Sequence, residues 1–482
     1  MSGIEKVLKE SFGYDFFRPL QKDIITDMLA KNDILVLMPT GAGKSICYQV
    51  PALYEGGLTV IISPLISLIY DQIADLKKHG ILAHYWCTGA SIGLQEIFRD
   101  ISVGACCMLY TTPESFNNNH DLKMLLAESK NLKRFIVDEV HCVSNWGHDF
   151  RSEYLKMDMK GQFPDVPICG FTATAPKIVQ SDIIDRLKMH EPIIWMTSYI
   201  KVNISYNIIR KEKSDWHWIN GNIFKFIKNG RSHQCGIIYC LSRKQCESLA
   251  GCLKDIGLSA EYYHASMDSS RKILVQQDWL DGKIKIIVAT IAFALGINKP
   301  DVRYVIHTSM PNSVESYYQQ AGRAGRDGKP SVVVLYYSEA DRSVLENMID
   351  YKHASNDAPV RNIIKIGQMY KLCDNNKDCI KMQLSNYLGE YGVKSCVIRD
   401  DIAKCSVCQN LGQQVTSFNI NTNVNAIRLL NCIGDRKVDI QHILNDEDKR
   451  ILNLLLNEEQ IQTAVVGVDG KYVEYIWKST GT

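Results

Sequence analysis

The sequence predicts an α/β protein with two parallel-sheet domains in tandem, followed by a helical metal-binding module and a short tail. Apolar strand-like runs alternate with amphipathic helical stretches in the first half of the chain, and the same alternation begins again after about residue 205. After residue 340 the sequence changes to helical stretches and then to closely spaced cysteines. We therefore expect four units, which comprise residues 1–205, 206–340, 341–410 and 411–482.

The composition is that of a soluble protein that binds no membrane. Of the 482 residues, 46% are hydrophobic and 22% are charged, and the net charge is only +2. Any contact with nucleic acid must therefore come from local basic patches. The 16 cysteines are scattered through apolar stretches, as expected for a reduced protein of the cytosol or nucleus. Neither a signal peptide nor an apolar run long enough to span a bilayer is apparent.

Ten apolar runs predict the strands of the two sheets, with crossover helices between them. In the first domain these runs are 34–38, 59–62, 107–110, 135–137 and 168–171. In the second domain they are 236–240, 259–263, 284–290, 302–306 and 332–336. Two consecutive α/β units of similar size indicate two domains of the nucleotide-binding type.

The stretch 38–45, Met-Pro-Thr-Gly-Ala-Gly-Lys-Ser, predicts a phosphate-binding loop directly after the first strand. Gly41 and Gly43 let backbone N–H groups close around phosphate oxygens at a helix N-terminus. Lys44 supplies a cation for the β- and γ-phosphates, and Ser45 is the expected Mg²⁺ ligand. The residues of this loop that we expect to bind ATP are Thr40, Gly41, Gly43, Lys44 and Ser45.

Two further motifs complete the features of an ATPase. Asp138 and Glu139 directly follow the apolar run 135–137, at the sheet edge where phosphoryl chemistry occurs. Asp138 is suited to holding Mg²⁺, and Glu139 to orienting or deprotonating the attacking water. Arg323 and Arg326 lie on a predicted helix half a chain away, and a guanidinium fork suits the charge that develops on phosphoryl oxygens. The sequence thus predicts a site split between two domains, so that ATP turnover drives domain motion.

Together with several other motifs, these stretches resemble the RecQ family of superfamily 2 DNA helicases, from about residue 8 to about residue 410. The other motifs are 12–21, 63–72, 110–114, 142–151, 171–175 and 289–300. The resemblance implies that both parallel-sheet domains are RecA-like and that Arg18 and Gln21 contact adenine. It also implies that Arg323 and Arg326 meet the γ-phosphate, with Arg326 as the arginine finger.

The stretch after the carboxylate pair resembles the aromatic-rich loop of this family. Trp146 and Phe150 offer flat faces on which unstacked bases can stack, worth about 1–3 kcal/mol per base. His148 and Arg151 add polar or phosphate contacts, and His141 can link the loop to the nucleotide site. Burial of Trp146 and Phe150 in the core is the alternative. The residues expected to contact DNA are Ser63, Asn145, Trp146, His148, Phe150 and Arg151.

A cysteine cluster predicts a structural zinc site. Cys379, Cys396, Cys405 and Cys408 offer four thiolates, the soft tetrahedral ligand set that Zn²⁺ prefers. Their order, a helix and then a knuckle, again resembles the family. Cys373 is a competing ligand, but it precedes the start of the family-like helix, and we expect it to be a free thiol.

Three residues depart from the family pattern. Ala294 replaces a usual glycine, Asn298 a usual aspartate and Gln320 a common glutamate. A DNA-binding scaffold with a degraded ATPase is therefore one alternative function, and an RNA-directed translocase of the same superfamily is another. The intact phosphate loop, Glu139 and both arginines argue against the first alternative. The zinc module and the aromatic-rich loop argue against the second.

The tail from residue 411 is expected to contain two helices, at 423–430 and 446–455, and then a β-hairpin. The predicted hairpin strands, 463–468 and 472–477, flank a favoured Asp-Gly turn. This order resembles a short winged helix, and a partner-docking or merely stabilising tail is the alternative.

The sequence thus predicts an ATP-dependent DNA helicase with ATP, Mg²⁺ and Zn²⁺ as cofactors. Its partners would be single-stranded DNA and duplex or branched DNA, in repair, recombination or replication. A 3′ to 5′ direction follows from the resemblance alone. The expected location is the nucleus, or the cytoplasm if the source is bacterial.

Overall fold

The computed structural model describes most of the chain. The described residues are 3–39, 41–87, 90, 92–129, 131–144, 146–147, 151–212, 216–293, 299–349, 358–391, 393, 395–396, 402–415, 438–439, 461–468 and 471–478. The chain forms two compact units, of which the first comprises Met1–Asn375 with Gln383–Gly392 and the second Asn376–Met382 with Val393–Thr482. Within the described ranges, no helix has both the length and the apolar character needed to cross a bilayer.

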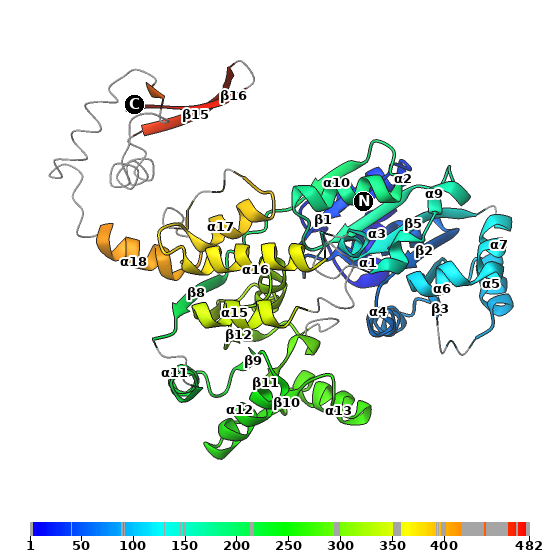
Figure 1. The fold of residues 1–482 in the computed structure, drawn as a ribbon. Coiled ribbons are helices and arrows are strands. Elements are labelled where there is room, and N and C mark those ends of the chain that lie inside the picture. Colours follow the sequence, from blue (N-terminus) through cyan, green and yellow to red (C-terminus); the bar gives the residue numbers. More distant parts are fainter. Residues whose placement is uncertain are drawn as a thin grey trace. The chain divides into compact units, whose positions relative to one another are not determined.

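The first unit contains two parallel sheets, the first of which has seven strands in the order β3-β4-β2-β5-β6-β1-β7 (Figure 1). These strands are β1 (Ile34–Leu37), β2 (Leu58–Ile62), β3 (His84–Trp86), β4 (Met108–Thr111), β5 (Leu132–Asp138), β6 (Ile168–Thr172) and β7 (Ile193–Met196). Every neighbouring pair is parallel. The carboxyl ends of β1 and β5 therefore meet at one edge, which brings the phosphate loop and the carboxylate pair together.

The first sheet and its helices are called the first lobe below. Its helices are α1 (Gly3–Phe12), α2 (Gln21–Leu29), α3 (Lys44–Glu55), α4 (Ile66–Lys78), α5 (Leu94–Ser102), α6 (Pro113–Asn118), α7 (His120–Glu128), α8 (Ser152–Leu155), α9 (Met159–Gln162) and α10 (Lys177–Leu187), with a 3₁₀ turn, η1 (Val140–Val143). They cover the sheet so that its strands β1, β2, β4 and β6 are wholly buried.

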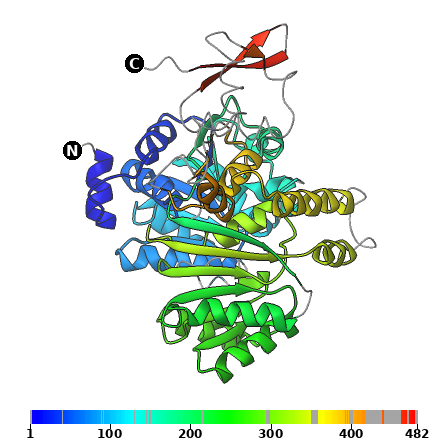
Figure 2. The same ribbon diagram turned by 90° about the vertical axis from the view of Figure 1, so that its left-hand side faces the viewer.

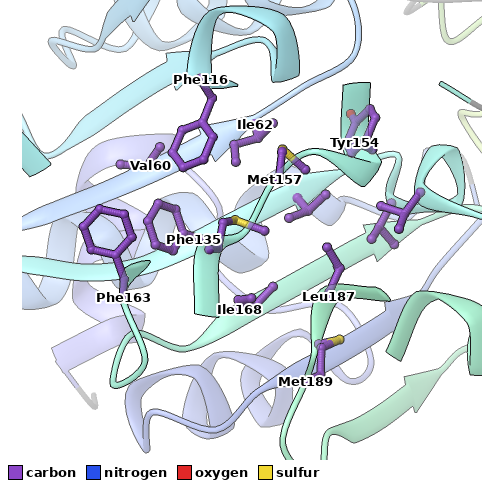
Figure 3. Packing of buried hydrophobic residues seen from close by; sticks show 14 of the residues in the cluster. Val60, Ile62, Phe116, Phe135, Tyr154, Met157, Phe163, Ile168, Leu187 and Met189 are labelled. Carbon is purple, nitrogen blue, oxygen red and sulfur yellow. The ribbon is translucent and has the colours of Figure 1, made fainter. Parts of the chain in front are cut away.

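Two hydrophobic cores lie on the two faces of the first sheet. Leu35 of β1 belongs to one core and its neighbour Ile34 to the other, as the two-residue period of a strand requires. In the first of these cores the rings of Phe116 and Phe135 meet edge to face at 5.9 Å, and Figure 3 shows them beside Val60. Each fully buried side chain of this size contributes about 1.5–3 kcal/mol. This packing makes the sheet a rigid support for the loops at its edge.

The second sheet and its helices are called the second lobe. Its six parallel strands, in the order β10-β11-β9-β12-β13-β8, run side by side in green and yellow-green in Figure 2. They are β8 (Ile204–Arg210), β9 (Cys235–Tyr239), β10 (Ala260–Tyr263), β11 (Ile286–Ala289), β12 (Val302–His307) and β13 (Ser331–Tyr337). The helices are α11 (Trp216–Lys228), α12 (Arg243–Asp255), α13 (Ser269–Leu280) and α14 (Val314–Ala321), with a 3₁₀ turn, η2 (Ile291–Phe293).

The remaining elements follow the second lobe. They are α15 (Glu339–Asn347), α16 (Ala358–Asp374), α17 (Ile380–Tyr387), α18 (Ser406–Val415), β14 (Val438–Asp439), β15 (Ile461–Val468) and β16 (Lys471–Lys478). Helices α15 and α16 belong to the first unit, and α18 and the three strands belong to the second. The three strands form an antiparallel sheet in the order β14-β16-β15.

All ten predicted strands of the parallel sheets are present, but three more were missed. β3 and β7 are the short edge strands of the first sheet, and β8 is one of the two edge strands of the second. Each is partly exposed or mixes polar with apolar residues, which weakens the apolar run that marks a central strand. In the tail, the pairing of β15 with β16 confirms the hairpin strands. The helices predicted at 423–430 and 446–455 lie outside the described residues, and the winged helix stays a prediction.

Candidate functional site

The phosphate loop joins β1 to the first turn of α3. Gly41 and Gly43 adopt left-handed backbone angles, with φ of 85° and 90°. A Cβ atom on Gly43 would lie 2.5 Å from Nε2 of Gln21, so a side chain at this position would collide as well as strain the backbone. The Lys44 ammonium group donates to the carbonyl oxygen of Met38 at 3.1 Å and so lies across the loop. Thr40 lies outside the described residues.

Arg18, which precedes α2, and Gln21, the first residue of α2, hold this loop in place. The Arg18 guanidinium donates to the carbonyl oxygen of Gly41 at 2.6 Å, and Gln21 Nε2 donates to that of Gly43 at 3.0 Å. The backbone N–H of Arg18 in turn donates to Gln21 Oε1 at 2.8 Å. The resemblance implied contacts with adenine, and those contacts stay a prediction. What the structure adds is a positioning role for both side chains at the phosphate loop.

The Asp138 carboxylate lies at the end of β5 facing Lys44. Burial and the neighbouring Glu139 raise the pKa of Asp138 to about 6, although Lys44 opposes this rise. Gln72 Nε2 donates to Asp138 Oδ2 at 3.3 Å, and the Tyr48 hydroxyl donates to Gln72 Oε1 at 2.8 Å. The carboxylate is therefore held by α4 and α3 and is screened from bulk water, as a metal-binding carboxylate needs to be.

Glu139 has an unusual backbone conformation. Its φ of 48° and ψ of 46° lie in the left-handed region, which costs about 1–2 kcal/mol for a residue with a side chain. His141 Nδ1 lies 3.3 Å from Glu139 Oε2 and 2.7 Å from the Thr172 hydroxyl. The buried imidazole of His141 therefore ties the carboxylate of Glu139 to the end of β6, where the motif 171–175 begins.

Arg323 and Arg326 lie in turns, not on a helix. Helix α14 ends at Ala321, and Gly325 takes a left-handed φ of 58° within the turns that follow. The prediction of a helical position was therefore wrong, because the glycines of this motif end the helix. The turns of residues 322–328 are called the arginine loop below.

The arginine loop of the second lobe lies against the phosphate loop of the first. The Cγ atom of Arg326 lies 3.4 Å from the position that a Cβ on Gly41 would occupy. Arg323 is only 6% exposed, and it interacts with the Tyr239 hydroxyl and with the charge of Glu139. Burial and the neighbouring Arg323 lower the pKa of Arg326 to about 9. Two guanidinium groups thus face a phosphate loop and a carboxylate that come from the other lobe.

Within the described part of the aromatic-rich loop, Trp146 lies at the surface, whereas Cys142, Val143 and Ser144 are buried. Trp146 is 36% exposed, and the Arg361 guanidinium lies 5.8 Å from the centre of its ring. The Lys365 ammonium donates to the carbonyl oxygen of Gly147 at 2.7 Å. Gly147 is needed here, since a Cβ atom would lie 2.2 Å from the carbonyl oxygen of His141. The core alternative is therefore wrong for Trp146. Asn145, His148 and Phe150 lie outside the described residues.

The two other residues predicted to contact DNA form hydrogen bonds with other residues of the protein. Ser63 is fully buried, and its backbone N–H donates to the carbonyl oxygen of Thr111 at 3.0 Å. The Arg151 guanidinium donates to the carbonyl oxygen of Pro64. Both residues therefore brace the loop that precedes α4, and their contacts with DNA stay predictions.

Four buried thiols of the second unit lie together. The sulfur atoms of Cys379, Cys396, Cys405 and Cys408 are all within 4.8 Å of one another. The Cys379–Cys396, Cys396–Cys405 and Cys405–Cys379 sulfur distances are 3.6, 3.7 and 4.0 Å. A tetrahedron with zinc–sulfur bonds of about 2.3 Å has edges of about 3.8 Å, so the cluster fits Zn²⁺. Cys373 lies in α16 of the first unit and is not part of this cluster.

Several residues of the site were not found from the sequence. Gln72 lies within a motif that resembles the family, but nothing in the sequence around it indicates that it forms a hydrogen bond with Asp138. Tyr48 resembles any buried aromatic residue of a helix, and Lys201 lies between the two sheets in a stretch without a motif. Only the approach of the two lobes reveals Lys201, whose charge interacts with those of Lys44 and both arginines.

The phosphate loop, the carboxylate pair and arginines from a second sheet define a helicase-type ATPase. Residues 18–181 match the DEAD/DEAH box helicase family, and residues 220–328 match the helicase conserved C-terminal domain. Residues 339–410 match the RecQ zinc-binding family. These three matches run in the same order as the two lobes and the cysteine cluster.

Curated relatives extend this similarity over most of the chain. It is 37% identical over 437 residues to "Putative ATP-dependent DNA helicase Q1" of Caenorhabditis briggsae, covering 89% of this chain and 69% of that protein. It is 39% identical over 440 residues to "RecQ-like DNA helicase blm-1" of Caenorhabditis elegans, covering 88% of this chain and 44% of that protein. The chain belongs to the RecQ family of superfamily 2 helicases. It spans less than half of the length of several of the curated relatives that it matches.

Solved structures of other helicases share the fold. The crystal structure of the DUF1998 helicase MrfA bound to DNA has a TM-score of 0.58 and 17% identity, covering 99% of this chain and 64% of that chain. At this identity the likeness shows the fold alone, which is two RecA-like parallel-sheet domains. The family matches and the geometry of the two sites make ATP with Mg²⁺, and Zn²⁺, the cofactors of the chain.

Proposed function

We propose that this protein is an ATP-dependent DNA helicase that translocates on single-stranded DNA and unwinds duplex or branched DNA. The observation that supports this best is the arginine loop, which comes from the second lobe and lies against the phosphate loop of the first. In a site built from two lobes, bound ATP contacts both lobes and therefore favours the arrangement in which they are close together. Hydrolysis removes some of these contacts, so the lobes can then move apart. The relatives from both Caenorhabditis species are named DNA helicases, which supports DNA as the nucleic acid along which this protein moves.

The first lobe is proposed to bind and activate the nucleotide. Lys44 and the N–H groups of Gly41 and Gly43 would hold the phosphates, while Ser45 and Asp138 would hold Mg²⁺. Bound Mg²⁺ would neutralise charge on the β- and γ-phosphates. The buried position of Asp138, between Gln72 and Lys44, supports its role as a metal-binding carboxylate.

The attack on the γ-phosphate is proposed to use residues of both lobes. Glu139 would orient the attacking water and accept its proton, and the contact of its Oε2 with His141 Nδ1 at 3.3 Å would hold the carboxylate in position. Arg326 and Arg323 would stabilise the charge that develops on the phosphoryl oxygens. Arg18 and Gln21 would contact adenine from their positions beside the loop.

DNA is proposed to act on hydrolysis through the aromatic-rich loop. Trp146 offers an exposed ring to an unstacked base, and it lies five residues after His141. His141 contacts both Glu139 and Thr172, so a shift of the loop would be transmitted through His141 to the carboxylate that orients the attacking water. Stacking of this kind tolerates any base, and the accompanying contacts of cationic side chains with phosphates would weaken as salt rises.

Replacing Trp146 by Ala is expected to abolish the stimulation of ATPase activity by DNA. Nucleotide binding and the melting temperature should change little, because the ring is already 36% exposed. A matched control is Trp279→Ala, since that indole is fully buried and its removal should cost roughly 3–5 kcal/mol of stability. A melting temperature that falls as far for Trp146→Ala as for Trp279→Ala would remove the coupling role.

ATP hydrolysis measured without nucleic acid, with single-stranded DNA and with single-stranded RNA tests the proposed function as a whole. We expect strong stimulation by DNA and little by RNA, with a stimulation that declines as salt rises. Equal stimulation by RNA would favour the RNA-directed translocase. Binding of DNA without hydrolysis would favour the scaffold with a degraded ATPase.

The finer features of the proposal rest on the family. We propose 3′ to 5′ movement, a role in DNA repair, recombination or replication, and a nuclear location. We also propose units at residues 1–205, 206–340, 341–410 and 411–482. The change of sheet between β7, which ends at Met196, and β8, which begins at Ile204, supports the first of these limits.

A further inference from the structure

The segment that joins the two lobes, residues 197–203, is bound closely to the arginine loop. We call it the connecting segment. The Tyr318 hydroxyl donates to the carbonyl oxygen of Tyr199 at 2.8 Å, and the Tyr199 N–H donates to Glu390 Oε2 at 2.7 Å. Asn203 Nδ2 donates to the carbonyl oxygen of Gly325 at 2.8 Å. The Thr197 N–H also donates to the carbonyl oxygen of Leu37 in the first lobe, at 3.0 Å. The segment is therefore held by hydrogen bonds on both sides of the arginine loop and is not a loose linker.

Lys201 lies at the centre of this segment and contacts the arginine loop directly. Its ammonium group donates to the carbonyl oxygen of Gly322 at 2.9 Å, and Gly322 immediately precedes Arg323. A Cβ atom on Gly322 would lie 3.4 Å from the same nitrogen. A shift of Lys201 would therefore be transmitted to the backbone that carries Arg323 and Arg326.

The charges around Lys201 are mostly of its own sign. Its neighbours are Arg326, Lys44 and Arg323, so four cations gather from the two lobes and from the segment that joins them. The carboxylates that interact with this group are Asp138, beside Lys44, and Glu139, beside Arg323. When Lys201 is protonated, four cations and two carboxylates leave an excess of two positive charges. A nucleoside triphosphate with Mg²⁺ carries about two negative charges and a diphosphate with Mg²⁺ about one, so the triphosphate balances the group better.

We propose that Lys201 is a positioning residue of the nucleotide site, which holds the arginine loop through Gly322 and adds a charge that favours a nucleoside triphosphate over a diphosphate. This inference rests on the proposed ATPase function. The connecting segment would thus contribute to the discrimination between the nucleoside triphosphate and the diphosphate. Binding of the triphosphate would then change the interactions of the connecting segment as well as those of the two lobe surfaces that face the nucleotide.

The protonation of Lys201 supplies a readout that a purely structural lysine would not give. Burial, Arg326, Lys44 and Arg323 lower the pKa of Lys201 to about 7. A polyanion that binds beside it raises this pKa, so at about pH 8 the site takes up a proton when the nucleotide binds. The heat of binding should therefore depend on the ionisation enthalpy of the buffer. The part of this uptake that is lost in a Lys201 variant is the informative quantity, because arginines stay protonated at this pH.

Calorimetric titration of the whole chain with ADP and with a non-hydrolysable ATP analogue, each with Mg²⁺ and in two buffers, tests the proposal. Lys201→Met should weaken binding of the analogue about tenfold, leave ADP affinity nearly unchanged and reduce the buffer-dependent heat. Lys201→Arg keeps the charge and should keep the preference for the triphosphate. Asn203→Ala is the matched control, since it loosens the same segment but retains all four cations.

Three results would overturn the proposal. Lys201→Met could bind both nucleotides as the unchanged protein does, it could weaken both equally, or Asn203→Ala could lose the same preference. Melting temperatures of all three variants identify any that fail to fold, and Lys201→Arg then carries the test alone. The binding preference is measured without hydrolysis or DNA. Absence of DNA-stimulated ATPase activity in the unchanged protein would therefore reject the helicase proposal separately.

Discussion

Arg326→Ala is expected to retain ATP binding and to lose nearly all turnover. The guanidinium group of Arg326 lies against the phosphate loop, and its charge matters most when negative charge develops on the phosphoryl oxygens. Removal of such an arginine finger typically costs about 10³–10⁵ in kcat. The measurement is steady-state ATP hydrolysis with saturating single-stranded DNA, together with nucleotide affinity determined without turnover.

Two further variants make this result specific. Arg342→Ala removes a half-exposed arginine of α15 that pairs with Glu346, and it should leave kcat unchanged. Lys44→Ala should also remove nearly all hydrolysis and unwinding, with the fold and DNA binding largely retained, because it deletes a phosphate contact and no core packing. Normal hydrolysis by Arg326→Ala would mean that the active site is not split between the lobes.

Cys405→Ser is expected to release zinc and to give an aggregation-prone protein. Metal analysis of the unchanged chain should find about one zinc, because four thiolates complete one tetrahedral site. The free energy of metal binding is also folding free energy in so small a module, so loss of one ligand affects both. Zinc content and the melting curve are the measurements, and removal of zinc by a chelator should reproduce the effect in the unchanged protein.

Cys373→Ser is the matched control for the zinc site. Cys373 is as buried as the cluster cysteines, but it lies in α16 of the first unit. Its replacement should leave about one zinc per chain. Loss of metal in Cys373→Ser together with retention in a Cys379→Ser variant would show that the ligand set is wrong.

The central strands of both sheets could be predicted because burial on two faces leaves an unbroken apolar run. The run 34–38, for example, predicts β1 almost to the residue. The edge strand β8, Ile-Ser-Tyr-Asn-Ile-Ile-Arg, is less covered and contains polar residues. Its sequence therefore resembles that of a loop. Its position could follow only from its pairing with β13, a contact between segments more than a hundred residues apart.

The candidate site was predictable where chemistry dictates residue type and spacing. Gly41, Gly43 and Lys44 must stand together in sequence, because one helix N-terminus holds the phosphates. Lys201 and Gln72 could not be found in this way, because each acts through a neighbour that folding brings to it. The same reason hid the positioning role of Arg18.

Helix α16 belongs by sequence to the RecQ zinc-binding match, yet it is part of the first unit, and the cysteine cluster is part of the second. Arg361 and Lys365 of this helix hold the turn that carries Trp146. The family match to residues 339–410 therefore does not coincide with a compact unit of the structure. A shortened version that stopped after the second sheet would keep every ATPase motif and lose the support of its aromatic turn. We therefore expect the smallest fragment whose ATPase activity responds to DNA to extend through α16, and changes in that helix to impair this response before they impair metal retention.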